Sequence, residues 1–285
     1  MYEIISTKEL APKIKMAEVK APEIAEKAQP GQFIVVRVDE NGERIPLTIA
    51  DYDPVKGTVA TVFQEVGVST EKLGGLKPGE GIMDFVGPLG TPSEMARFGR
   101  VMMVGGGVGV PPLYPQAGAL RKLGNTVVSI IGARTADLLV FEEEMRAVSD
   151  ELHIATDDGS RGFKGFVTDL LRSLIEKGPK PDRVIAVGPA IMMKAVSDVT
   201  RPFKIKTIVS LNSIMVDATG MCGACRVSVG GRTRFTCVHG PEFDGHEVDF
   251  EELMARLRTY VEKEKASLHR YKQSQRGGQR CPERV

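Results

Sequence analysis

Hydrophobic and polar positions follow two different rhythms along the chain. Up to about residue 95, short alternating runs are cut by turn residues, as in KIKMAEV, QPGQFIVVRV, RIPLTIADYD, GTVATVFQEVG and GEGIMDFVGPLG. From residue 100 onward, apolar strand patterns alternate with amphipathic helical patterns, as in RVMMVGGG followed by LYPQAGALRKLG. The first rhythm predicts a small antiparallel barrel. The second predicts a parallel sheet with helices on both faces.

A third pattern begins after residue 211, where the chain is rich in glycine and cysteine up to about residue 247. Its apolar residues are too few for a conventional core, so we expect something other than packing to hold it. Asp249 and Glu252 then form a capping-box pattern that predicts a helix start. Apolar residues recur after it at the spacing of one docked amphipathic helix: Phe250, Leu253, Met254, Leu257, Tyr260 and Val261. The polar, basic tail that follows is expected to be mobile.

These patterns divide the 285 residues into four expected parts. They are a β-barrel over 1–97, an α/β domain over 98–211, a small cysteine-rich module over 212–248, and a helix with a tail over 249–285. The expected fold class is therefore β-barrel plus α/β, with a small C-terminal module.

Composition narrows the function classes. The 38 basic and 37 acidic residues give a net charge of +1, which offers no electrostatic reason to expect nucleic acid or an anionic membrane surface as a partner. The N-terminus lacks a signal-peptide core, and no apolar run approaches the roughly 18 residues of a membrane span. Three of the four cysteines lie within 222–237, unlike a secreted disulfide framework. We expect a soluble cytoplasmic enzyme or electron carrier that uses its cysteines for metal.

The glycine-rich segment VMMVGGGVGVPPL, residues 101–113, reads as a strand that turns into a helix. Glycines let the backbone approach a pyrophosphate, and the helix N-terminus offers free N–H groups, although a tight turn without any ligand would look the same. Similar segments end the later strands, and ligands of open α/β sheets bind at the carboxyl ends of strands. The candidate nucleotide-binding residues are Gly106, Gly107, Val108, Gly109, Pro111, Gly132, Ala133, Arg134, Asp157, Asp158, Gly159, Gly188 and Pro189.

The barrel region carries the segments Arg44-Ile-Pro-Leu-Thr48, Gly67-Val-Ser-Thr70 and Gly87-Pro-Leu-Gly90, each of which taken alone is a surface arginine or a plain turn. In this order, and with Pro30-Gly-Gln-Phe33, they resemble the ferredoxin–NADP reductase superfamily. That resemblance implies that the first segment lines FAD and that the second lies near its phosphates. The candidate flavin-binding residues are Arg44, Pro46, Leu47, Thr48, Phe63, Gly67, Ser69, Thr70, Gly87 and Pro88.

The cysteines match the last three positions of the plant-type [2Fe–2S] pattern, C-x4-C-x2-C…C. Cys222, Cys225 and Cys237 occupy those positions, and Asp217 stands where the first cysteine is expected. A carboxylate can ligate iron, so Asp217 is the candidate fourth ligand. Three alternatives remain: Cys281 folding back, a zinc site completed by His239, or free thiols.

A barrel, a nucleotide domain and a [2Fe–2S] module in this order resemble the electron-transfer subunits of dihydroorotate dehydrogenase and their relatives. The spacing Asp217-x4-Cys222-x2-Cys225-x11-Cys237, together with GARTADLLVFEEEM, is similar to the small-subunit family of NADH-dependent ferredoxin:NADP oxidoreductases, in which aspartate replaces the first cysteine. The resemblance implies that hydride passes from nicotinamide to FAD. Single electrons then pass through the cluster to a larger flavin and iron–sulfur subunit, which would carry electron bifurcation to ferredoxin.

No catalytic side chain is expected in such a protein, because the cofactors carry the chemistry. The alternatives are a dihydroorotate dehydrogenase electron-transfer subunit, a sulfide dehydrogenase subunit or, in another class, a zinc-stabilised nucleotide-binding regulator.

The nucleotide is expected to be NAD(H). Arg134 follows the second strand of the α/β domain and is suited to a 2′-phosphate, which leaves NADP(H) as the alternative. Asp137, Asp157 and Asp158 lie close by in the sequence pattern and would repel such a phosphate. Among the histidines, His153 is expected to pack in a strand, and His246 and His269 to be solvated.

Overall fold

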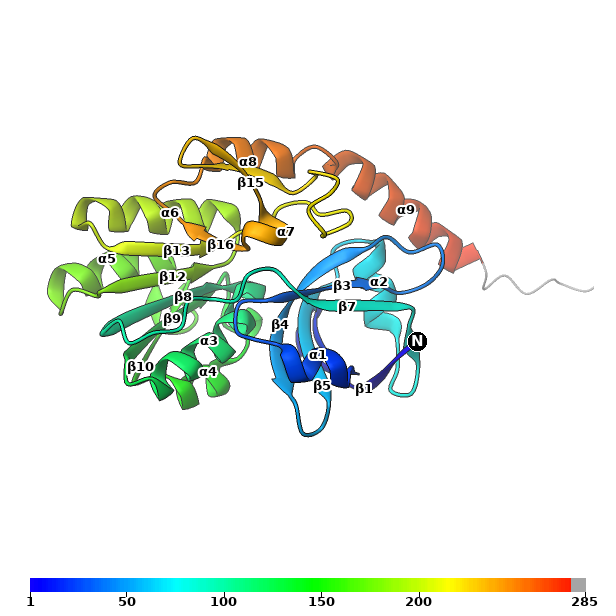
Figure 1. Cartoon of the computed structure of the whole chain (residues 1–285), viewed down its shortest axis with the longest axis horizontal. Coiled ribbons are helices and arrows are strands. Elements are labelled where there is room, and N and C mark those ends of the chain that lie inside the picture. Colours follow the sequence, from blue (N-terminus) through cyan, green and yellow to red (C-terminus); the bar gives the residue numbers. More distant parts are fainter. Residues whose placement is uncertain (278–285) are drawn as a thin grey trace, which may run out of the picture.

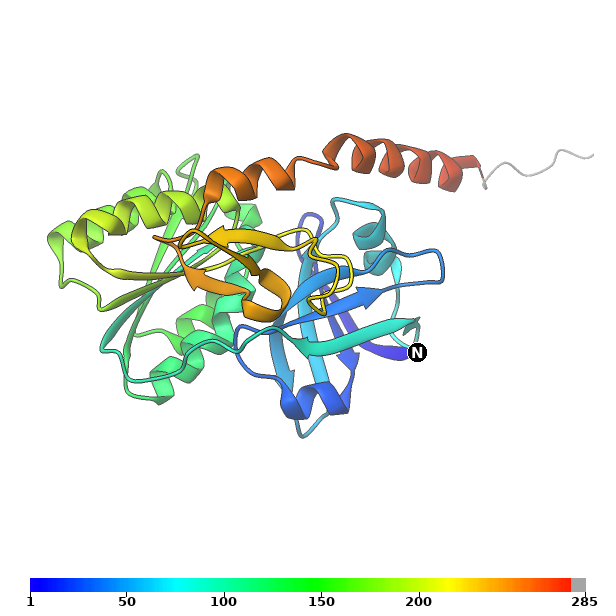
Figure 2. The same cartoon turned by 45° about the horizontal axis from the view of Figure 1, so that its top comes forward.

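The structure, a computed structural model, describes residues 1–277 of the chain. Figure 1 shows a barrel beside an α/β domain, with the cysteine-rich segment lying across the top of both. The last helix continues from that segment over the barrel, and Figure 2 shows the same arrangement with the top turned forward. In this range no helix is long and apolar enough to cross a membrane.

The barrel is a seven-stranded antiparallel sheet that is nearly closed, in the order β6-β1-β2-β5-β4-β3-β7. Its strands are β1 (Tyr2–Ala11), β2 (Ile14–Lys20), β3 (Phe33–Arg37), β4 (Ile45–Asp53), β5 (Thr58–Gln64), β6 (Gly81–Ile82) and β7 (Asp84–Leu89). Two short helices, α1 (Pro22–Lys27) and α2 (Val68–Gly75), accompany them. Ile4, Ile34, Phe63 and Phe85 are buried in its core. The expected antiparallel barrel is confirmed.

Strand β3 is buried on both faces. Ile34 and Val36 point into the barrel core, whereas Phe33 and Val35 point outward into a second cluster with residues of the cysteine-rich segment. Side chains alternate between the two faces of a strand, so the apolar run FIVV serves two cores at once. This double burial explains why the run lacks the polar alternation of its neighbours.

The α/β domain is built on a second seven-stranded sheet, in the order β11-β10-β9-β8-β12-β13-β16. Its strands are β8 (Arg100–Gly106), β9 (Thr126–Ala133), β10 (Glu151–Thr156), β11 (Phe163–Lys164), β12 (Arg183–Val187), β13 (Lys206–Ser210) and β16 (Glu242–Asp244). All neighbouring pairs are parallel except β13 with β16. The expected parallel sheet is thus confirmed, with one antiparallel edge strand added from the cysteine-rich segment.

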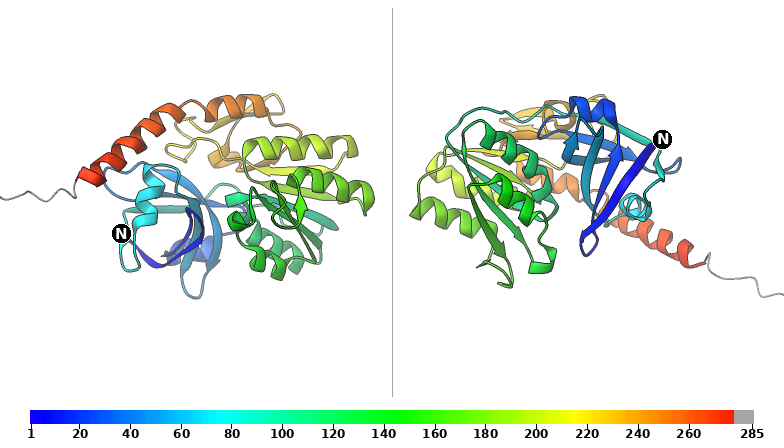
Figure 3. Two further views of the ribbon diagram at one scale, coloured as in Figure 1. Left: turned by 180° about the vertical axis from the view of Figure 1, so that it is seen from behind. Right: turned by 90° about the horizontal axis from the view of Figure 1, so that it is seen from below.

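Helices cover both faces of this sheet, as expected, and Figure 3 shows them from behind and from below. Helices α3 (Val110–Lys122) and α4 (Glu142–Val148) pack on one face, and α5 (Val167–Lys177) and α6 (Ala190–Thr200) on the other. The domain also contains three short 3₁₀ turns, which follow β8, β9 and α6: η1 (Gly107–Gly109), η2 (Ala136–Leu138) and η3 (Arg201–Phe203). The face under α3 shares its hydrophobic cluster with barrel residues Ala50 and Val62, which fixes the two domains to each other.

The cysteine-rich segment forms the hairpin β14 (Arg226–Val229) and β15 (Arg232–Phe235), the short helix α7 (Thr236–His239) and strand β16. Val227 and Val229 pack into the α5–α6 face of the α/β core, and Met215 and Ala218 pack against β3. Packing therefore contributes to holding this segment, in addition to the non-packing element that was expected. Its few apolar residues complete two neighbouring cores rather than building one of their own.

The C-terminal region differs from the single helix that was expected. Helix α8 (Phe250–Leu257) begins at the predicted cap, where the Asp249 Oδ1 atom accepts from the Glu252 amide at 2.9 Å. The chain then turns, and a separate helix α9 (Val261–Gly277) includes the first part of the tail that was expected to be mobile, the rest of which lies outside the described residues. Strong helix formers fill this stretch, which explains its helicity. The Lys272 Nζ atom lies 2.8 Å from the Glu71 Oε1 atom of α2, so α9 reaches the barrel.

Candidate cofactor sites

The flavin motif lies on strand β4, next to β3. Phe33 pairs with Thr48 and Val35 pairs with Pro46, so these four residues point to the same outer face of the barrel. Leu47 faces the barrel core instead, and so does Phe63 of β5. Of these candidates, Pro46 and Thr48 therefore offer side chains to a ligand outside the barrel, while Leu47 and Phe63 support it from within.

This outer face lies between the other two candidate sites. On one side, Ala50 and Val62 pack against Val110 and Leu113 of helix α3, which follows the glycine turn. On the other side, Phe33 and Val35 pack against cysteines of the predicted cluster. A flat ring placed over Pro46 and Thr48 would therefore have the glycine turn on one side and the cysteine loop on the other.

Arg44 stands at the edge of this face with a half-exposed side chain. Its Nη2 atom lies 3.4 Å from the Asp84 Oδ2 atom, which also accepts from the Arg37 Nε atom at 2.6 Å. The hydrogen bond from Arg37, together with the positive charge of both arginines, lowers the pKa of Asp84. Arg44 makes only this long contact with Asp84, so its other N–H groups are available to bind an anion.

The segment Gly67–Thr70 forms the start of helix α2. The Thr70 Oγ1 atom accepts from the amides of Val66 and Gly67, each at 3.1 Å. A side chain at Gly67 would meet no protein atom within 4 Å, so there is open space at this helix N-terminus. Free N–H groups and the positive end of the helix dipole make it suitable for a phosphate.

Gly87 has a structural explanation, because a Cβ atom there would lie 2.7 Å from the Ile34 Cγ2 atom. Pro88 follows it on β7 through a cis peptide bond. Packing alone accounts for this glycine, and the flavin role of both residues stays a prediction.

The glycine turn after β8 combines packing with openness. At Gly109 a Cβ atom would collide with the Val187 carbonyl oxygen, so glycine is required there for close approach to β12. At Gly107 the φ angle is +56°, and a Cβ atom would meet nothing within 4 Å. The turn therefore leaves open space in front of Gly107, where a ligand can approach the backbone.

The other strand ends converge beside this turn. Gly132 of β9 pairs with Gly106, Thr156 of β10 pairs with Ala133, and Val187 of β12 pairs with Gly105. All predicted nucleotide segments thus reach the same edge of the sheet: 106–111, 132–134, 157–159 and 188–189. Their contact with a nucleotide remains a prediction.

The charged residues at this edge differ in how they are held. Asp158 accepts from both the amide and the hydroxyl group of Ser160, and these bonds lower the pKa of the Asp158 carboxyl. Asp157 and Arg134 are exposed. The hydrogen bonds of Asp158 thus hold it within its own turn, whereas Asp157 and Arg134 face the solvent, and their contact with a ribose remains a prediction.

The cysteine loop brings part of the predicted ligand set together. The Cys225 and Cys237 Sγ atoms lie 3.2 Å apart in the cluster beneath the loop. Asp217 lies at the other end of the loop, where its Oδ2 atom accepts from the Cys222 amide and its Oδ1 atom from the Thr219 amide, both at 3.0 Å. Cys222 is exposed and Asp217 is half-buried, whereas Cys225 and Cys237 are buried.

Three thiols and one carboxylate are a donor set of the number that a two-iron cluster requires. Among the described residues, no three His, Cys, Asp or Glu groups gather closely enough to hold one metal ion. A [2Fe–2S] cluster instead distributes four ligands over two irons. Burial, followed by the neighbouring Cys225, raises the pKa of the Cys237 thiol to about 12. A bound metal would remove this proton, because a coordinating thiol is deprotonated.

The alternative ligands receive less support. The Nδ1 atom of His239 accepts from the Phe235 amide at 2.9 Å, and its ring stacks on the Phe235 ring with centroids 5.8 Å apart. One ring face and one ring nitrogen of His239 are therefore already in contact with the hairpin. This argues against His239 as a zinc ligand. Cys281 lies outside the described residues.

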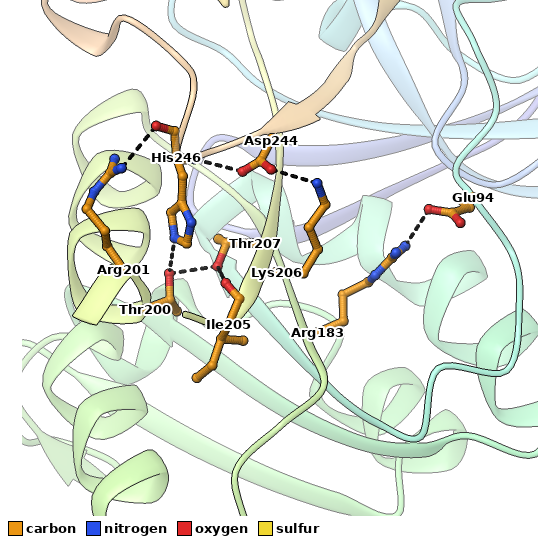
Figure 4. A network of polar contacts seen from close by, with 9 residues as sticks. All are labelled: Glu94, Arg183, Thr200, Arg201, Ile205, Lys206, Thr207, Asp244 and His246. Carbon is orange, nitrogen blue, oxygen red and sulfur yellow. Dashed lines mark hydrogen bonds and ion pairs between the residues drawn. The ribbon is translucent and has the colours of Figure 1, made fainter. Parts of the chain in front are cut away.

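Two other histidines are only partly as expected. His153 is partly buried in β10, as predicted. His246 is not solvated: its Nε2 atom lies 2.9 Å from the Thr200 hydroxyl, and burial lowers its pKa (Figure 4). The sequence gives no sign of this contact, because 46 positions separate the two residues.

Comparison with known proteins places this geometry in a family. Residues 212–249 match the iron–sulfur cluster binding domain of dihydroorotate dehydrogenase B. A homologue of the dihydroorotate dehydrogenase B electron-transfer subunit from Thermotoga maritima is 49% identical over 92% of this chain and 95% of its own length. The electron-transfer subunit from Bacillus caldolyticus is 37% identical over 79% of this chain and 88% of its own length. The chain belongs to this electron-transfer subunit family.

A solved structure adds a second line of similarity. One chain from a study of flavin-based electron bifurcation by NADH-dependent reduced ferredoxin-NADP oxidoreductase aligns with a TM-score of 0.90 and 47% identity, over 95% of this chain and 98% of its own. Phthalate dioxygenase reductase, at 17% identity and a TM-score of 0.56 over 80% of this chain and 85% of its own, shares the fold. The family resemblance drawn from the motifs is confirmed. The oxidoreductase class and the expected types of cofactor, flavin, pyridine nucleotide and iron–sulfur cluster, are confirmed with it.

Sequence reasoning missed the role of β3 in this electron-transfer subunit. Phe33 and Val35 contact both the predicted flavin strand and the buried cysteines, yet only Phe33 was noticed, as the end of a turn motif. The signal was present in the run FIVV, which has no polar face and so predicts burial on both sides.

Proposed function

We propose that this chain takes hydride from NADH onto FAD and passes single electrons through a [2Fe–2S] cluster to a larger flavin and iron–sulfur subunit. The reaction would be NADH-dependent ferredoxin:NADP oxidoreduction with electron bifurcation. The observation that carries the proposal is the position of the outer face of β3 and β4 between the glycine turn and the cysteine loop. This order of sites is the order in which electrons would move.

The residues of the chain would divide the work as follows. Pro46, Thr48 and Arg44 line the flavin ring, and the N-terminus of α2 at Gly67–Thr70 binds phosphate. FAD, when bound, supplies the conversion of a two-electron hydride into single electrons. The glycine turn and the strand ends around it position the nucleotide, and water is kept out by the packing of α3 against the barrel.

Asp217, Cys222, Cys225 and Cys237 would hold the cluster. Cys225 and Cys237 sit in the apolar cluster with Phe33 and Val35, on the flavin side. Cys222 is exposed, and Asp217, which accepts from the Cys222 amide, is half-buried beside it. One edge of the bound cluster would therefore face the flavin barrel and the other the surface.

The surface around the cysteine loop carries exposed apolar side chains, as docking sites do. The exposed fractions of Met221, Val216 and Val238 are 88%, 58% and 41%. Gly220, beside Met221, lies against Val238, where an added Cβ atom would be 3.1 Å from the Val238 Cγ1 atom. Exposed apolar residues gathered at one place mark interaction surfaces. We assign this apolar rim, Met221 and Val238, to the larger subunit, together with Val216 from the start of the same loop.

The bifurcating role is favoured over dihydroorotate oxidation by two observations. The aspartate at position 217 matches the small-subunit pattern of the NADH-dependent ferredoxin:NADP oxidoreductases. The chain from the bifurcation study is 47% identical, and the Thermotoga maritima protein, named only as a homologue of the dihydroorotate dehydrogenase subunit, is 49% identical, whereas the Bacillus caldolyticus electron-transfer subunit is 37% identical. Closely spaced reduced cysteines also suit a cytoplasmic location, which is part of this proposal.

Isolation of the native complex tests the function directly. The chain is tagged in its host, and the co-purifying subunit and its cofactors are identified. We expect a larger subunit with flavin and iron–sulfur clusters, and NADH-dependent, ferredoxin-linked turnover of NADP. Recovery of a dihydroorotate-oxidising subunit would support the alternative. A colourless preparation with zinc in place of iron and flavin would reject both.

A further inference from the structure

The barrel, the α/β domain and the cysteine-rich segment meet at one buried polar junction. The Ser93 amide donates to the Pro30 carbonyl at 2.9 Å, and Gln32 Nε2 donates to the Gly90 carbonyl at 2.9 Å. The Thr91 amide donates to the Gly240 carbonyl at 2.7 Å. The connection between β7 and β8 is thus bonded to the barrel on one side and to the cysteine-rich segment on the other.

Glu242 lies at the centre of this junction. Its Oε1 atom accepts from the Ser93 hydroxyl at 2.6 Å and from Gln116 Nε2 at 2.9 Å. Ser93 belongs to the β7–β8 connection and Gln116 to helix α3, and both are buried. One carboxyl group therefore ties β16 to the connection from the barrel and to the helix that follows the glycine turn.

The pairing with Gln116 is incomplete if Glu242 is ionised. Within residues 1–277, the buried Oε1 atom of Gln116 receives no hydrogen bond. An ionised carboxylate can only accept, whereas a neutral carboxylic acid also donates one O–H. A neutral acid facing a primary amide forms a two-bond ring, in which the acid donates to the amide oxygen and the amide donates to the acid oxygen. That ring would satisfy Gln116 Oε1.

The charged groups around Glu242 leave it without a cation. Arg183 Nη1 pairs with Glu94 Oε2 at 2.8 Å, and its guanidinium stacks over the Phe98 ring at 3.6 Å. Lys206 Nζ pairs with Asp244 at 2.6 Å (Figure 4). Glu94, Arg183, Asp244 and His239 line one cleft together with Glu242. Burial raises the pKa of Glu242, although hydrogen bonds from Ser93 and Gln116 and the charge of Arg183 oppose the rise.

We propose that Glu242 is a positioning residue that carries a proton at neutral pH and, as a neutral acid paired with the Gln116 amide, joins the cysteine-rich segment to α3 and to the β7–β8 connection. No net charge is then buried where the three parts meet. Loss of the proton would place a negative charge against the Gln116 carbonyl oxygen and weaken the junction.

The sign of the pH dependence follows from linkage. A carboxyl whose pKa is higher in the folded chain than its ordinary value of 4.5 keeps a proton that the unfolded chain releases. Its contribution to stability is complete below that ordinary value and is lost as the pH rises through the folded pKa. Glu242→Gln keeps the two-bond ring without a titrating proton, so it avoids this loss.

The first test compares the pH profiles of holoprotein variants. Melting temperatures of the wild type and Glu242→Gln are measured between about pH 4 and about pH 8. We expect similar values at the acid end and a growing advantage for Glu242→Gln as the pH rises. A Glu242→Gln protein that is less stable at neutral pH and recovers on acidification would show that Glu242 acts as an ionised acceptor, which overturns the proposal.

Asp244→Asn is the matched control, because Asp244 is an acid on the same strand in the opposite situation. Burial opposes its ionisation, but hydrogen bonds from Lys206 and the His246 amide outweigh that effect and lower its pKa. Asp244→Asn should therefore reduce the melting temperature at neutral pH, with a difference that persists down to about pH 4 and shrinks only below it, as the pH falls through the lowered pKa of Asp244.

The second test observes the proton itself. Infrared spectra of the wild type at neutral pH should contain a neutral carboxylic acid band that moves in deuterium oxide and disappears in Glu242→Gln. Gln116→Leu should shift that band, since the acid loses its amide partner, and it serves if Glu242→Gln does not fold. Absence of the band from the wild type overturns the proposal. Neither test requires electron transfer, so the result is independent of the proposed function.

Discussion

The Sγ atoms of Cys225 and Cys237 lie 3.2 Å apart although twelve positions separate the two residues in the chain. The hairpin β14–β15 brings them together, because Arg226, which follows Cys225, pairs with Phe235, which lies two positions before Cys237. Half of the predicted cluster site is therefore preformed by strand pairing. The other half depends on the loop that carries Asp217 and Cys222.

Replacement of Asp217 tests the fourth ligand. Asp217→Cys should retain a [2Fe–2S] cluster with an altered visible spectrum and midpoint potential, because a thiolate replaces a carboxylate on one iron. Asp217→Ala should make the cluster labile, as measured by iron and sulfide content after purification. Cys281→Ser is the control and should leave the cluster unchanged. A full, unaltered cluster in Asp217→Ala, together with its loss in Cys281→Ser, would move the fourth ligand to the tail.

Arg44→Ala and Thr70→Ala should each lower the FAD content of the purified protein. The first removes a partly free guanidinium beside the outer face of β4, and the second removes the hydroxyl that orders the start of α2. Arg37→Ala is the control, because it removes the shorter ion pair to Asp84 but lies outside the flavin motif. Full flavin occupancy in both motif variants would locate the flavin elsewhere, and equal loss in Arg37→Ala would assign the effect to Asp84.

Phe33→Ala should destabilise the protein by about 3–5 kcal/mol, because it leaves a cavity between the barrel and the cysteines. Phe33→Leu should cost less, since it retains most of the apolar volume. Unfolding in urea and iron content are measured together, and we expect the cluster to be lost before the flavin. Ile34→Val, which alters the opposite face of the same strand, should cost about 0.5–1.5 kcal/mol and leave the iron content unchanged. Equal iron loss in both would contradict a specific contact with the cluster site.

Flavin reduction should be faster with NADH than with NADPH. Exposed Asp157 beside Arg134 would repel a 2′-phosphate, and Asp158 adds charge although its carboxyl is bound to Ser160. Stopped-flow reduction of the isolated subunit by each nucleotide decides the matter. A clear preference for NADPH that disappears in Arg134→Ala would identify Arg134 as the phosphate-binding residue and reverse the assignment.

Met221→Glu should weaken association with the larger subunit without reducing flavin or iron content, because a charge would be placed in the apolar rim. Val55→Glu is the control, since Val55 is 96% exposed on a barrel turn. Affinity is measured between the purified subunits. Unchanged affinity in Met221→Glu would place the docking surface elsewhere on the chain.

The local patterns predicted the barrel, the parallel sheet and the glycine turn because each depends on neighbouring residues. Alternation over KIKMAEV and the strand-to-turn sequence RVMMVGGG report on the nearest few positions, and both were interpreted correctly. The contact of His246 with Thr200 was not predicted, because it joins positions far apart. Neither was the addition of β16 to the edge of the α/β sheet.

The C-terminal helices show a different limit. Apolar spacing from Phe250 to Val261 fits one helix, but Tyr260 is 46% exposed and the chain turns before Val261. The direction of α9 is set by its contact with α2, including the pair Lys272–Glu71. Periodicity reports which residues prefer burial, and it does not report which surface is available to bury them.

In strand β3, inserting or deleting a residue within positions 33–36 should be more damaging than replacing one apolar residue there by another. Its inward and outward side chains belong to different cores, and a shift of one position exchanges the two faces of a strand. Deletion of a single residue there would turn Ile34 and Val36 toward the cysteines and Phe33 toward the barrel interior. A conservative apolar replacement keeps every side chain on its own face. Natural variation in this strand should therefore consist of substitutions, with insertions and deletions confined to the turns that flank it.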